Sequence, residues 1–154
     1  MPILNDTKKK GLDEVGKLLV DAIKQSIDDK GVNASGNLKD SVEYVVTDTG
    51  LQVLANYYFP YAEVGRKEGN IPKDFGSILA DWVKNKGISV PSQFKDELQF
   101  GWAIANKIKM YGSKRYRDSN PVDLLEDAIE KAEPMIDEIL SGYFLQTIND
   151  DLNI

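Results

Sequence analysis

Apolar residues recur at every third or fourth position near the start of the chain, a spacing that places them on one face of a helix. The pattern predicts a helix over residues 8–29, which Gly31 is suited to end. Its apolar positions are Leu12, Val15, Leu19, Ile23 and Ile27. A shorter helix is predicted over residues 75–86, because an apolar stripe there is followed by a cationic end and Gly87. Trp82 belongs to this stripe and is expected in the core.

Two further helices are predicted in the C-terminal half of the chain. Residues 92–111 keep a helical period behind Ser92, a residue type that caps helix N-termini, and Trp102 is expected in the core. Residues 121–147 keep the same period across Pro134, which must kink or split a helix at that point. The apolar stripe expected in this last helix is Leu125, Ile129, Ala132, Ile136, Ile139, Tyr143 and Phe144.

Between the first two helices the sequence is rich in residues that favour strands. Two short runs are separated by Asp48-Thr49-Gly50, a strong hairpin signal. We therefore predict an antiparallel hairpin over residues 41–55, preceded by a loop and a single helical turn within residues 33–41. A lone hairpin is marginally stable, so it must pack on helices or pair with another strand.

Nothing in the sequence divides the chain, since repeats, low-complexity stretches and linkers are all absent. Its 154 residues are the length of one domain, which buries roughly 68 to 70% of its unfolded surface. We predict a single α+β domain over residues 1–154. In it, a long N-terminal helix and an antiparallel hairpin or small sheet pack with two to three further helices.

Residues 57–74 are predicted to form an exposed contact loop. An aromatic cluster of Tyr57, Tyr58, Phe59 and Tyr61 opens it, and these rings would be a stacking platform or, as we favour, partly core and partly interface anchors. Glu63 and Arg66 follow. They could serve an enzyme as an acid and an anion clamp, but no second carboxylate accompanies them, which favours an ion pair or a contact with a neighbouring molecule. The spacing of Gly65 and Gly69 fits neither the GxxxxGK(S/T) nor the GxGxxG pattern of phosphate-binding loops. With Pro72, these glycines indicate a turn.

Cysteine and histidine are both absent. Disulfides and thiolate zinc sites are therefore excluded, and so are nucleophilic sites that need a Cys/His or Ser/His/Asp set. A hydrolase with two carboxylates remains an alternative, although no pair of acids stands out. The acids of the last helix are spaced so that a divalent cation could be shared, but a solvated or partner-facing surface is the favoured interpretation. We expect no metal and no cofactor.

The charges are unevenly distributed along a chain of net charge −6, which argues against broad affinity for nucleic acid. Residues 105–117 hold no acid and five bases, namely Lys107, Lys109, Lys114, Arg115 and Arg117. Residues 118–151 hold ten acids and a single base. Such separation suits head-to-tail association, in which the basic patch of one subunit meets the acidic helix of the next. Because two tyrosines interleave the bases, a nucleic-acid-binding protein that uses residues 107–117 is the alternative.

No apolar run of eighteen residues occurs, and residues 1–10 lack the apolar stretch of a signal peptide. We therefore expect no membrane contact and a chain that is intracellular when made.

The order of these segments resembles that of the tail-completion, or head-to-tail joining, proteins of tailed bacteriophages. The resemblance runs from Ser35-Gly36-Asn37-Leu38, through the aromatic segment with Glu63-Val64-Gly65, to the helix that ends at Gly112. Two departures stand out. Ala62-Glu63-Val64-Gly65 takes the place of the family's frequent Val-Glu-Phe/Tyr-Gly, and Lys114-Arg115-Tyr116-Arg117 takes that of a Pro-Phe-Leu segment.

The resemblance implies a non-enzymatic virion protein, made in the host bacterial cytoplasm, that forms or joins an oligomeric ring at the head-tail connector or neck. Its implied partners are copies of itself and the portal, connector or tail proteins, with passing contact to genomic DNA in the channel. A closed ring needs two different complementary patches on each subunit. The candidate contact residues are Tyr57, Tyr58, Tyr61, Glu63, Arg66, Lys107, Lys109, Lys114, Arg115 and Arg117.

Overall fold

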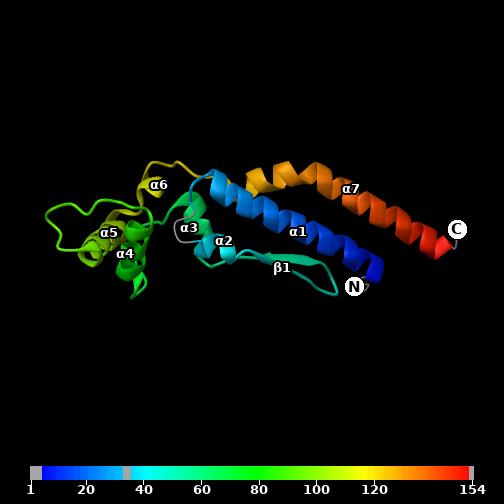
Figure 1. Cartoon of the computed structure of the whole chain (residues 1–154), viewed down its shortest axis with the longest axis horizontal. Coiled ribbons are helices and arrows are strands. Elements are labelled where there is room, and N and C mark those ends of the chain that lie inside the picture. The colour runs from blue at the N-terminus through cyan, green and yellow to red at the C-terminus, as the bar shows by residue number, and fades with distance from the viewer. Residues whose placement is uncertain (1–4, 33–35, 153–154) are drawn as a thin grey trace. The chain divides into compact units, whose positions relative to one another are not determined.

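The structure, a computed structural model, describes residues 5–32 and 36–152 (Figure 1). It is α+β, as predicted, with a long N-terminal helix, a two-stranded antiparallel sheet and several further helices. Within the chain, for which the sequence predicts a single domain over residues 1–154, the contacts group into two compact units. Unit 1 is drawn from Met1–Gly31, Leu38–Asn56 and Asp123–Ile154, and unit 2 from Val32–Asn37 and Tyr57–Val122. Each unit is made of separate chain segments, so the boundary leaves no linker signal in the sequence.

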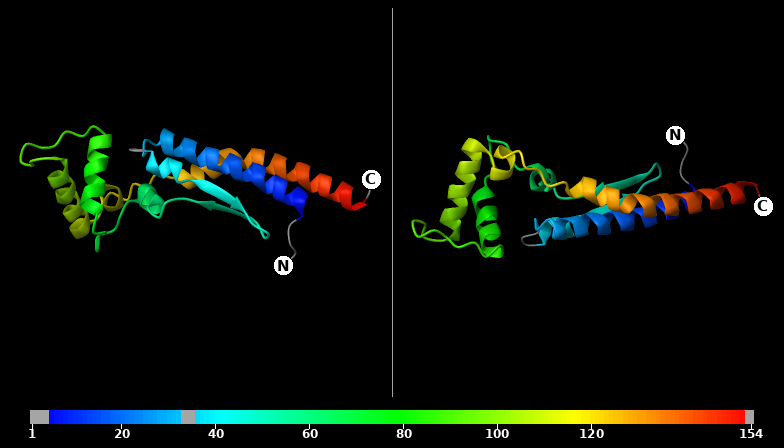
Figure 2. Two further views of the ribbon diagram at one scale, coloured as in Figure 1. Left: turned by 60° about the horizontal axis from the view of Figure 1, so that its bottom comes forward. Right: turned by 90° about the horizontal axis from the view of Figure 1, so that it is seen from above.

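Unit 1 is built on two long antiparallel helices, α1 (Asp6–Asp29) and α7 (Leu124–Leu152), which lie side by side in Figures 1 and 2. At one end Lys30 pairs with Asp127 at 2.5 Å, and toward the other the Tyr143 hydroxyl donates to Glu14 at 2.5 Å. The fully buried side chains between these ends include Ile27, Leu124, Ala128 and Ala132. The alanines let the two helices approach closely.

The prediction for α1 is confirmed, including its stop. Asn5 caps the helix by accepting a hydrogen bond from the Lys8 amide at 2.9 Å. After the helix the chain turns through Gly31 at a φ of 65°, a left-handed conformation that glycine adopts without strain. Of the predicted apolar stripe, Val15, Ile23 and Ile27 are buried and Leu12 and Leu19 are half-buried. Val20, outside the predicted stripe, is buried as well.

For α7 both ends of the predicted range 121–147 are wrong, since the helix runs from residue 124 to residue 152. It continues through the exposed Pro134, which the prediction expected to kink or split it, so the helix is not split there. Packing against α1 on both sides of that proline stabilises the helix beyond what its local propensity provides. The buried stripe is also displaced by one residue at its start, because Leu124 and Ala128 face α1 while Leu125 and Ile129 are exposed.

The predicted hairpin is present as β1 (Glu43–Val46) and β2 (Leu51–Leu54), which pair from Glu43↔Leu54 to Val46↔Leu51. The Thr47 amide closes its turn by donating to the Gly50 carbonyl at 2.7 Å. Before it comes α2 (Asn37–Asp40), the expected helical turn, while residues 33–35 of the predicted loop lie outside the described part of the chain.

The hairpin packs against α1. Gly16 makes this possible, because a Cβ there would overlap the ring of Tyr44. The Tyr44 hydroxyl then donates to Asp13 of α1 at 2.8 Å. The hairpin is thus stabilised by a helix, one of the two solutions that its small size requires.

Unit 2 contains α3 (Phe59–Val64), α4 (Phe75–Asn85), α5 (Glu97–Tyr111) and α6 (Lys114–Arg117). Helices α4 and α5 pack on each other around the buried Ala80, Val83 and Ala105. A Cβ on Gly76 would overlap the half-buried ring of Trp102, so glycine allows this pair of helices to close. The prediction of a helix over residues 75–86 is confirmed to within a residue.

Three expectations for unit 2 are corrected. The helix predicted over residues 92–111 begins at residue 97, because Asp96 rather than Ser92 caps it, accepting from the Gln99 amide at 2.8 Å. Trp82 is 39% exposed, and its neighbour Val83 fills the core instead. The predicted contact loop 57–74 contains the short helix α3, and residues 107–117, which we call the basic strip, contain the short helix α6. Both helices are too short to show a helical period in the sequence.

Candidate partner-contact site

The two segments predicted to contact partners, residues 57–74 and 107–117, lie against each other in unit 2. The Arg66 amide donates to Ser113 Oγ at 2.9 Å, and the Ser113 amide donates to the Arg66 carbonyl at 2.8 Å. The Gly69 amide donates to the Lys109 carbonyl at 2.9 Å. Residues far apart in the sequence therefore form one surface, which we call the contact site.

Two glycines allow the segments to come this close. Gly65 has a φ of 82°, and a Cβ there would stand 2.5 Å from both Ser113 Oγ and the Tyr116 nitrogen. Gly112 has a φ of 77°, and its Cβ would stand 3.0 Å from the Arg66 carbonyl oxygen. Both positions combine a left-handed backbone with a lack of space, so glycine is required on two grounds.

Ser113 is the residue of this site that the sequence prediction missed. Its hydroxyl accepts from the Arg66 amide and also caps α6 by accepting from the Tyr116 amide at 3.4 Å. The signal was present, because a serine directly after a glycine and before a short polar run is typical of a helix N-cap. Its second role, holding a segment 47 residues away, has no local signature.

The aromatic residues at the start of the site are presented unequally. Tyr57 is 68% exposed and Tyr61 is 43% exposed, whereas Tyr58 is half-buried. The rings of Tyr57 and Tyr58 meet edge to face with their centroids 5.7 Å apart. Tyr57 and Tyr61 thus remain available as interface anchors, while Tyr58 supports Tyr57.

Arg66 organises the loop around itself. Its guanidinium lies over the rings of Tyr61 and Phe75, at 4.8 Å and 5.4 Å from their centroids, and donates to the Asn70 carbonyl at 2.8 Å. The group is half-buried by these contacts. We therefore assign it to holding the loop in shape rather than to clamping an anion.

Glu63 and Arg115 also face inward in part. Both are half-buried. The Glu63 carbonyl accepts from the Val122 amide at 2.7 Å, and the Arg115 guanidinium donates to the Ala62 carbonyl. These contacts tie α3 to the residues before α7. Glu63 and Arg115 therefore help to hold the contact site in shape and are less available to a partner than exposed residues.

The other bases of the strip are exposed, namely Lys107, Lys109, Lys114 and Arg117. Lys114 pairs with Asp118 one helical turn away, and this hydrogen bond lowers the pKa of the Asp118 carboxyl. Lys107 and Lys109 come just before Met110 and Tyr111, which are 61% and 58% exposed. The most accessible part of the strip is therefore both basic and apolar.

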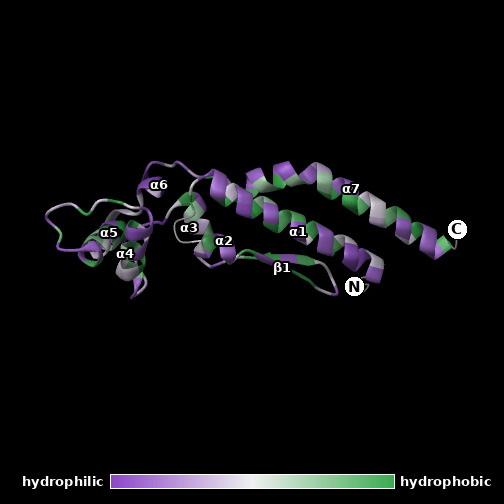
Figure 3. Ribbon diagram, in the orientation of Figure 1, coloured by the Kyte–Doolittle hydropathy of each residue, from purple (hydrophilic) through white to green (hydrophobic). Residues whose placement is uncertain are grey.

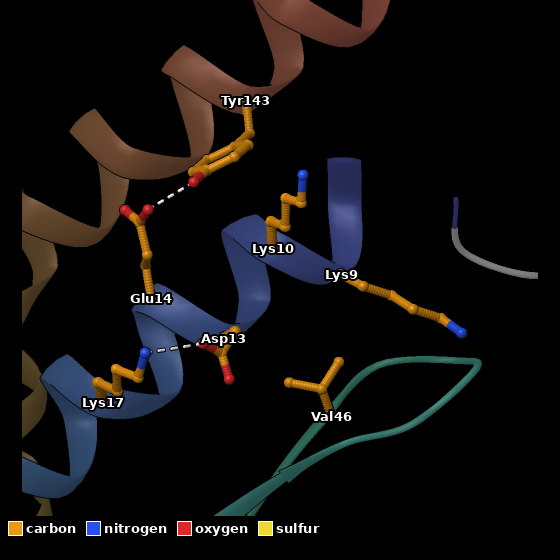
Figure 4. A pocket seen from close by; sticks show the side chains of 7 residues that line it. All are labelled: Lys9, Lys10, Asp13, Glu14, Lys17, Val46 and Tyr143. Atoms are coloured by element: carbon orange, nitrogen blue, oxygen red, sulfur yellow. Dashed lines mark hydrogen bonds and ion pairs between the residues drawn. The ribbon is translucent and has the colours of Figure 1, made fainter. Parts of the chain in front are cut away.

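A separate pocket of about 490 Å³ opens in unit 1 (Figure 4). It is lined by Lys9, Lys10, Asp13, Glu14, Lys17, Val46 and Tyr143. Hydrogen bonds from Lys17 and then Tyr44 lower the pKa of Asp13, and the bond to Glu14 raises the pKa of Tyr143. A hydrolase with two carboxylates needs one carboxyl whose pKa is raised. The pKa of Asp13 is shifted the opposite way.

In the part of the chain that the structure describes, no group of three or more acidic side chains is placed to hold a metal ion. Among those same residues, no helix has both the length and the apolar character needed to cross a bilayer. Comparisons of the chain with protein-family models, with curated proteins and with solved structures found no match.

Proposed function

We propose that the chain is a structural protein of a tailed-phage virion that forms or joins an oligomeric ring at the head-tail connector or neck. The observation that carries the proposal is the separation of two unlike surfaces. The contact site on unit 2 is basic and aromatic, whereas residues 126–138 of α7 in unit 1 carry six acids. Two different complementary patches on one subunit are what a closed ring of identical subunits requires.

The geometry of the contact site supports an assembly role over catalysis. Its two segments are joined by hydrogen bonds of the Arg66 and Gly69 backbone and by close contacts at two glycines, which hold them against each other. Exposed tyrosines on a rigid frame lose little conformational entropy when a partner covers them. The partners of the proposed ring are copies of this chain and adjoining portal, connector or tail proteins.

The proposal is tested by measuring the mass of the purified full chain by sedimentation velocity, alone and after mixing with a portal or tail protein. We expect a defined oligomer or a stoichiometric complex. A monomer that binds neither itself nor those proteins would contradict the proposal. Turnover of a small molecule that Glu63→Gln abolishes would favour the carboxylate hydrolase instead.

A second candidate is nucleic-acid binding through residues 107–117. It is favoured by one observation, the exposure of Lys107, Lys109 and Arg117 close to the exposed Tyr111 and Tyr116. Filter binding of duplex and single-stranded DNA at two salt concentrations separates the two functions. A DNA-binding protein loses affinity steeply as salt increases, whereas the ring subunit should show little binding at either concentration.

A further inference from the structure

The C-terminal half of α7 has an exposed apolar face that its contact with α1 does not use. Residues 139–149 contain no charged residue, and hydrophobic positions recur along this part of the helix in Figure 3. The Tyr143 ring lies against Gly11 of α1, and Thr147 is only 6% exposed. The other side of the helix carries Leu140, Phe144, Leu145, Ile148 and Leu152, which are 36% to 62% exposed. We call these five residues the α7 face.

An apolar cluster of this size on a surface marks an interaction site more often than chance exposure. Its two ends are acidic. Asp137 and Glu138 lie just before the face, and Asp150 and Asp151 lie at its far end, all of them exposed. A partner must therefore be apolar at its centre and must not bring acids to its ends.

This charge pattern argues against pairing of the α7 face with itself. An antiparallel pair centred on Phe144 would place Asp137 of one copy opposite Asp151 of the other. A parallel pair would place each acid beside the same acid of the second copy. Like charges at such positions are destabilising in both arrangements.

Helix α5 carries a surface with the complementary properties. Met110 and Tyr111 in its last turn are 61% and 58% exposed, and the exposed Lys107 lies one turn before them on the same side of the helix. Residues 98–111 include no acid. We call Lys107, Met110 and Tyr111 the α5 face.

We propose that the α7 face of one copy docks on the α5 face of a second copy. Met110 and Tyr111 then cover apolar side chains of the α7 face, and Lys107 meets Asp150 and Asp151 at one end of it. Because the two faces differ, each copy keeps one face free for the next, and the contact propagates into a ring if the rotation closes. The inference rests on the proposed ring function and names the contact that builds it.

Disulfide trapping tests which faces meet, and the chain suits it because it contains no cysteine of its own. One preparation of the full chain carries Phe144→Cys and another carries Met110→Cys. Mixing them under mild oxidation should give a crosslinked dimer that contains one of each. The matched control is Ile129→Cys, because Ile129 is 44% exposed on the same helix but lies outside the face, and it should not crosslink. A dimer of Phe144→Cys with itself as the main product would overturn the inference in favour of α7 pairing.

Substitution and charge reversal test the same contact without crosslinking. Leu140→Gln with Phe144→Gln should weaken self-association at least about tenfold, while Ile129→Gln leaves it unchanged. Lys107→Glu should weaken it as well, and adding Asp150→Lys with Asp151→Lys to the same chain should restore it. Circular dichroism and the unfolding midpoint show whether each variant is folded. Folded variants that all associate like the natural chain would overturn the inference.

These results separate the inference from the proposed function. If the natural chain assembles but neither face affects assembly, the ring function remains and the contact is wrong. If the chain binds portal or tail proteins and stays monomeric at its highest soluble concentration, the second copy is the wrong occupant and the virion role remains. A chain that does neither contradicts both.

Discussion

Arg66 and Ser113 hold each other by a reciprocal pair of hydrogen bonds across 47 residues of sequence. The Arg66 amide donates to the serine hydroxyl at 2.9 Å, and the Arg66 carbonyl accepts from the serine amide at 2.8 Å. Because only the backbone of Arg66 bonds to Ser113, its side chain can pack over Tyr61 and Phe75. This pair fixes the aromatic segment against the basic strip.

Replacing Ser113→Ala should destabilise the protein by about 1–2 kcal/mol, because the Arg66 amide loses its acceptor and α6 loses its N-cap. Urea-induced unfolding of the full chain measures the change. Ser89→Ala is the matched control, since Ser89 is exposed in a loop of the same unit, and it should stay within about 0.5 kcal/mol of the natural chain. Equal effects of the two changes would show that the Arg66–Ser113 pair contributes nothing.

Replacing Gly65→Ala should cost about 3 kcal/mol, because a strained backbone and an overlap with Ser113 and Tyr116 act together. Gly87→Ala separates the two effects. Gly87 also has a positive φ, 65°, but no atom lies within 4 Å of its Cβ position, so only the strain of about 1–2 kcal/mol remains. Thermal or urea unfolding of both variants gives the difference, and a smaller loss for Gly65→Ala than for Gly87→Ala would contradict the close approach.

Gly16→Ala should destabilise unit 1 by about 1–3 kcal/mol although alanine is the better helix former, because its Cβ would overlap the Tyr44 ring. Gly142→Ala, also in a helix but with open space around it, should stabilise the chain by about 1 kcal/mol. Opposite signs in the unfolding free energy are the expected result. Stabilisation by both changes would mean that the hairpin does not pack on α1 at Gly16.

Asp96→Ala should cost about 1 kcal/mol, because the aspartate accepts from the Gln99 amide at the start of α5. Ser92→Ala should change the unfolding free energy by less than about 0.5 kcal/mol, since Ser92 is exposed and lies outside the helix. Denaturant unfolding of the two variants compares them directly. A larger loss of stability for Ser92→Ala than for Asp96→Ala would support a start of α5 at Ser92, as the sequence predicts.

The ion pair between Lys9 of α1 and Asp48 of the hairpin, 2.6 Å long, should make stability depend on pH at both extremes. The hydrogen bond between them lowers the pKa of Asp48 and raises the pKa of Lys9. Its contribution is therefore fully present between the ordinary Asp and Lys pKa values. It is lost as pH falls through the lowered Asp48 pKa and as pH rises through the raised Lys9 pKa.

Unfolding midpoints of Lys9→Met and the natural chain across the pH range test this dependence. The two curves should differ at neutral pH and converge at both extremes. Asp13 and Asp118 also have lowered pKa values, so the variant should still lose stability in acid. A constant difference between the curves at all pH values would show that the ion pair has no role.

Local sequence signals were sufficient where one segment determines its own structure. The helical period of residues 8–29 and the glycine after it predict α1, and Asp48-Thr49-Gly50 between two strand-forming runs predicts the hairpin. They failed where two local signals compete, as at Ser92 and Asp96. Both are capping residues, but only at Asp96 does a Gln99 side chain return a bond, to the Lys95 amide at 2.6 Å.

For the contact site the sequence indicated the residue types and the two segments, but not their meeting. Tyr57, Tyr61, Lys107 and Lys109 are exposed as a contact surface requires. Arg66 and Arg115, predicted as contacts on the same grounds, are instead bound to carbonyls of their own unit. Charge and residue type do not tell which cations a neighbouring segment will engage.

The sequence by itself therefore determined the α+β class, the long helices and the hairpin, because helix period and turn chemistry depend on residues close in the chain. Only the tertiary structure decided that Leu124 rather than Leu125 faces α1, that α7 continues through Pro134, and that Arg66 meets Ser113. In each case the outcome depends on which distant segment covers a surface. An apolar stripe predicts that one face of a helix will be buried, but only the tertiary structure shows which segment buries it.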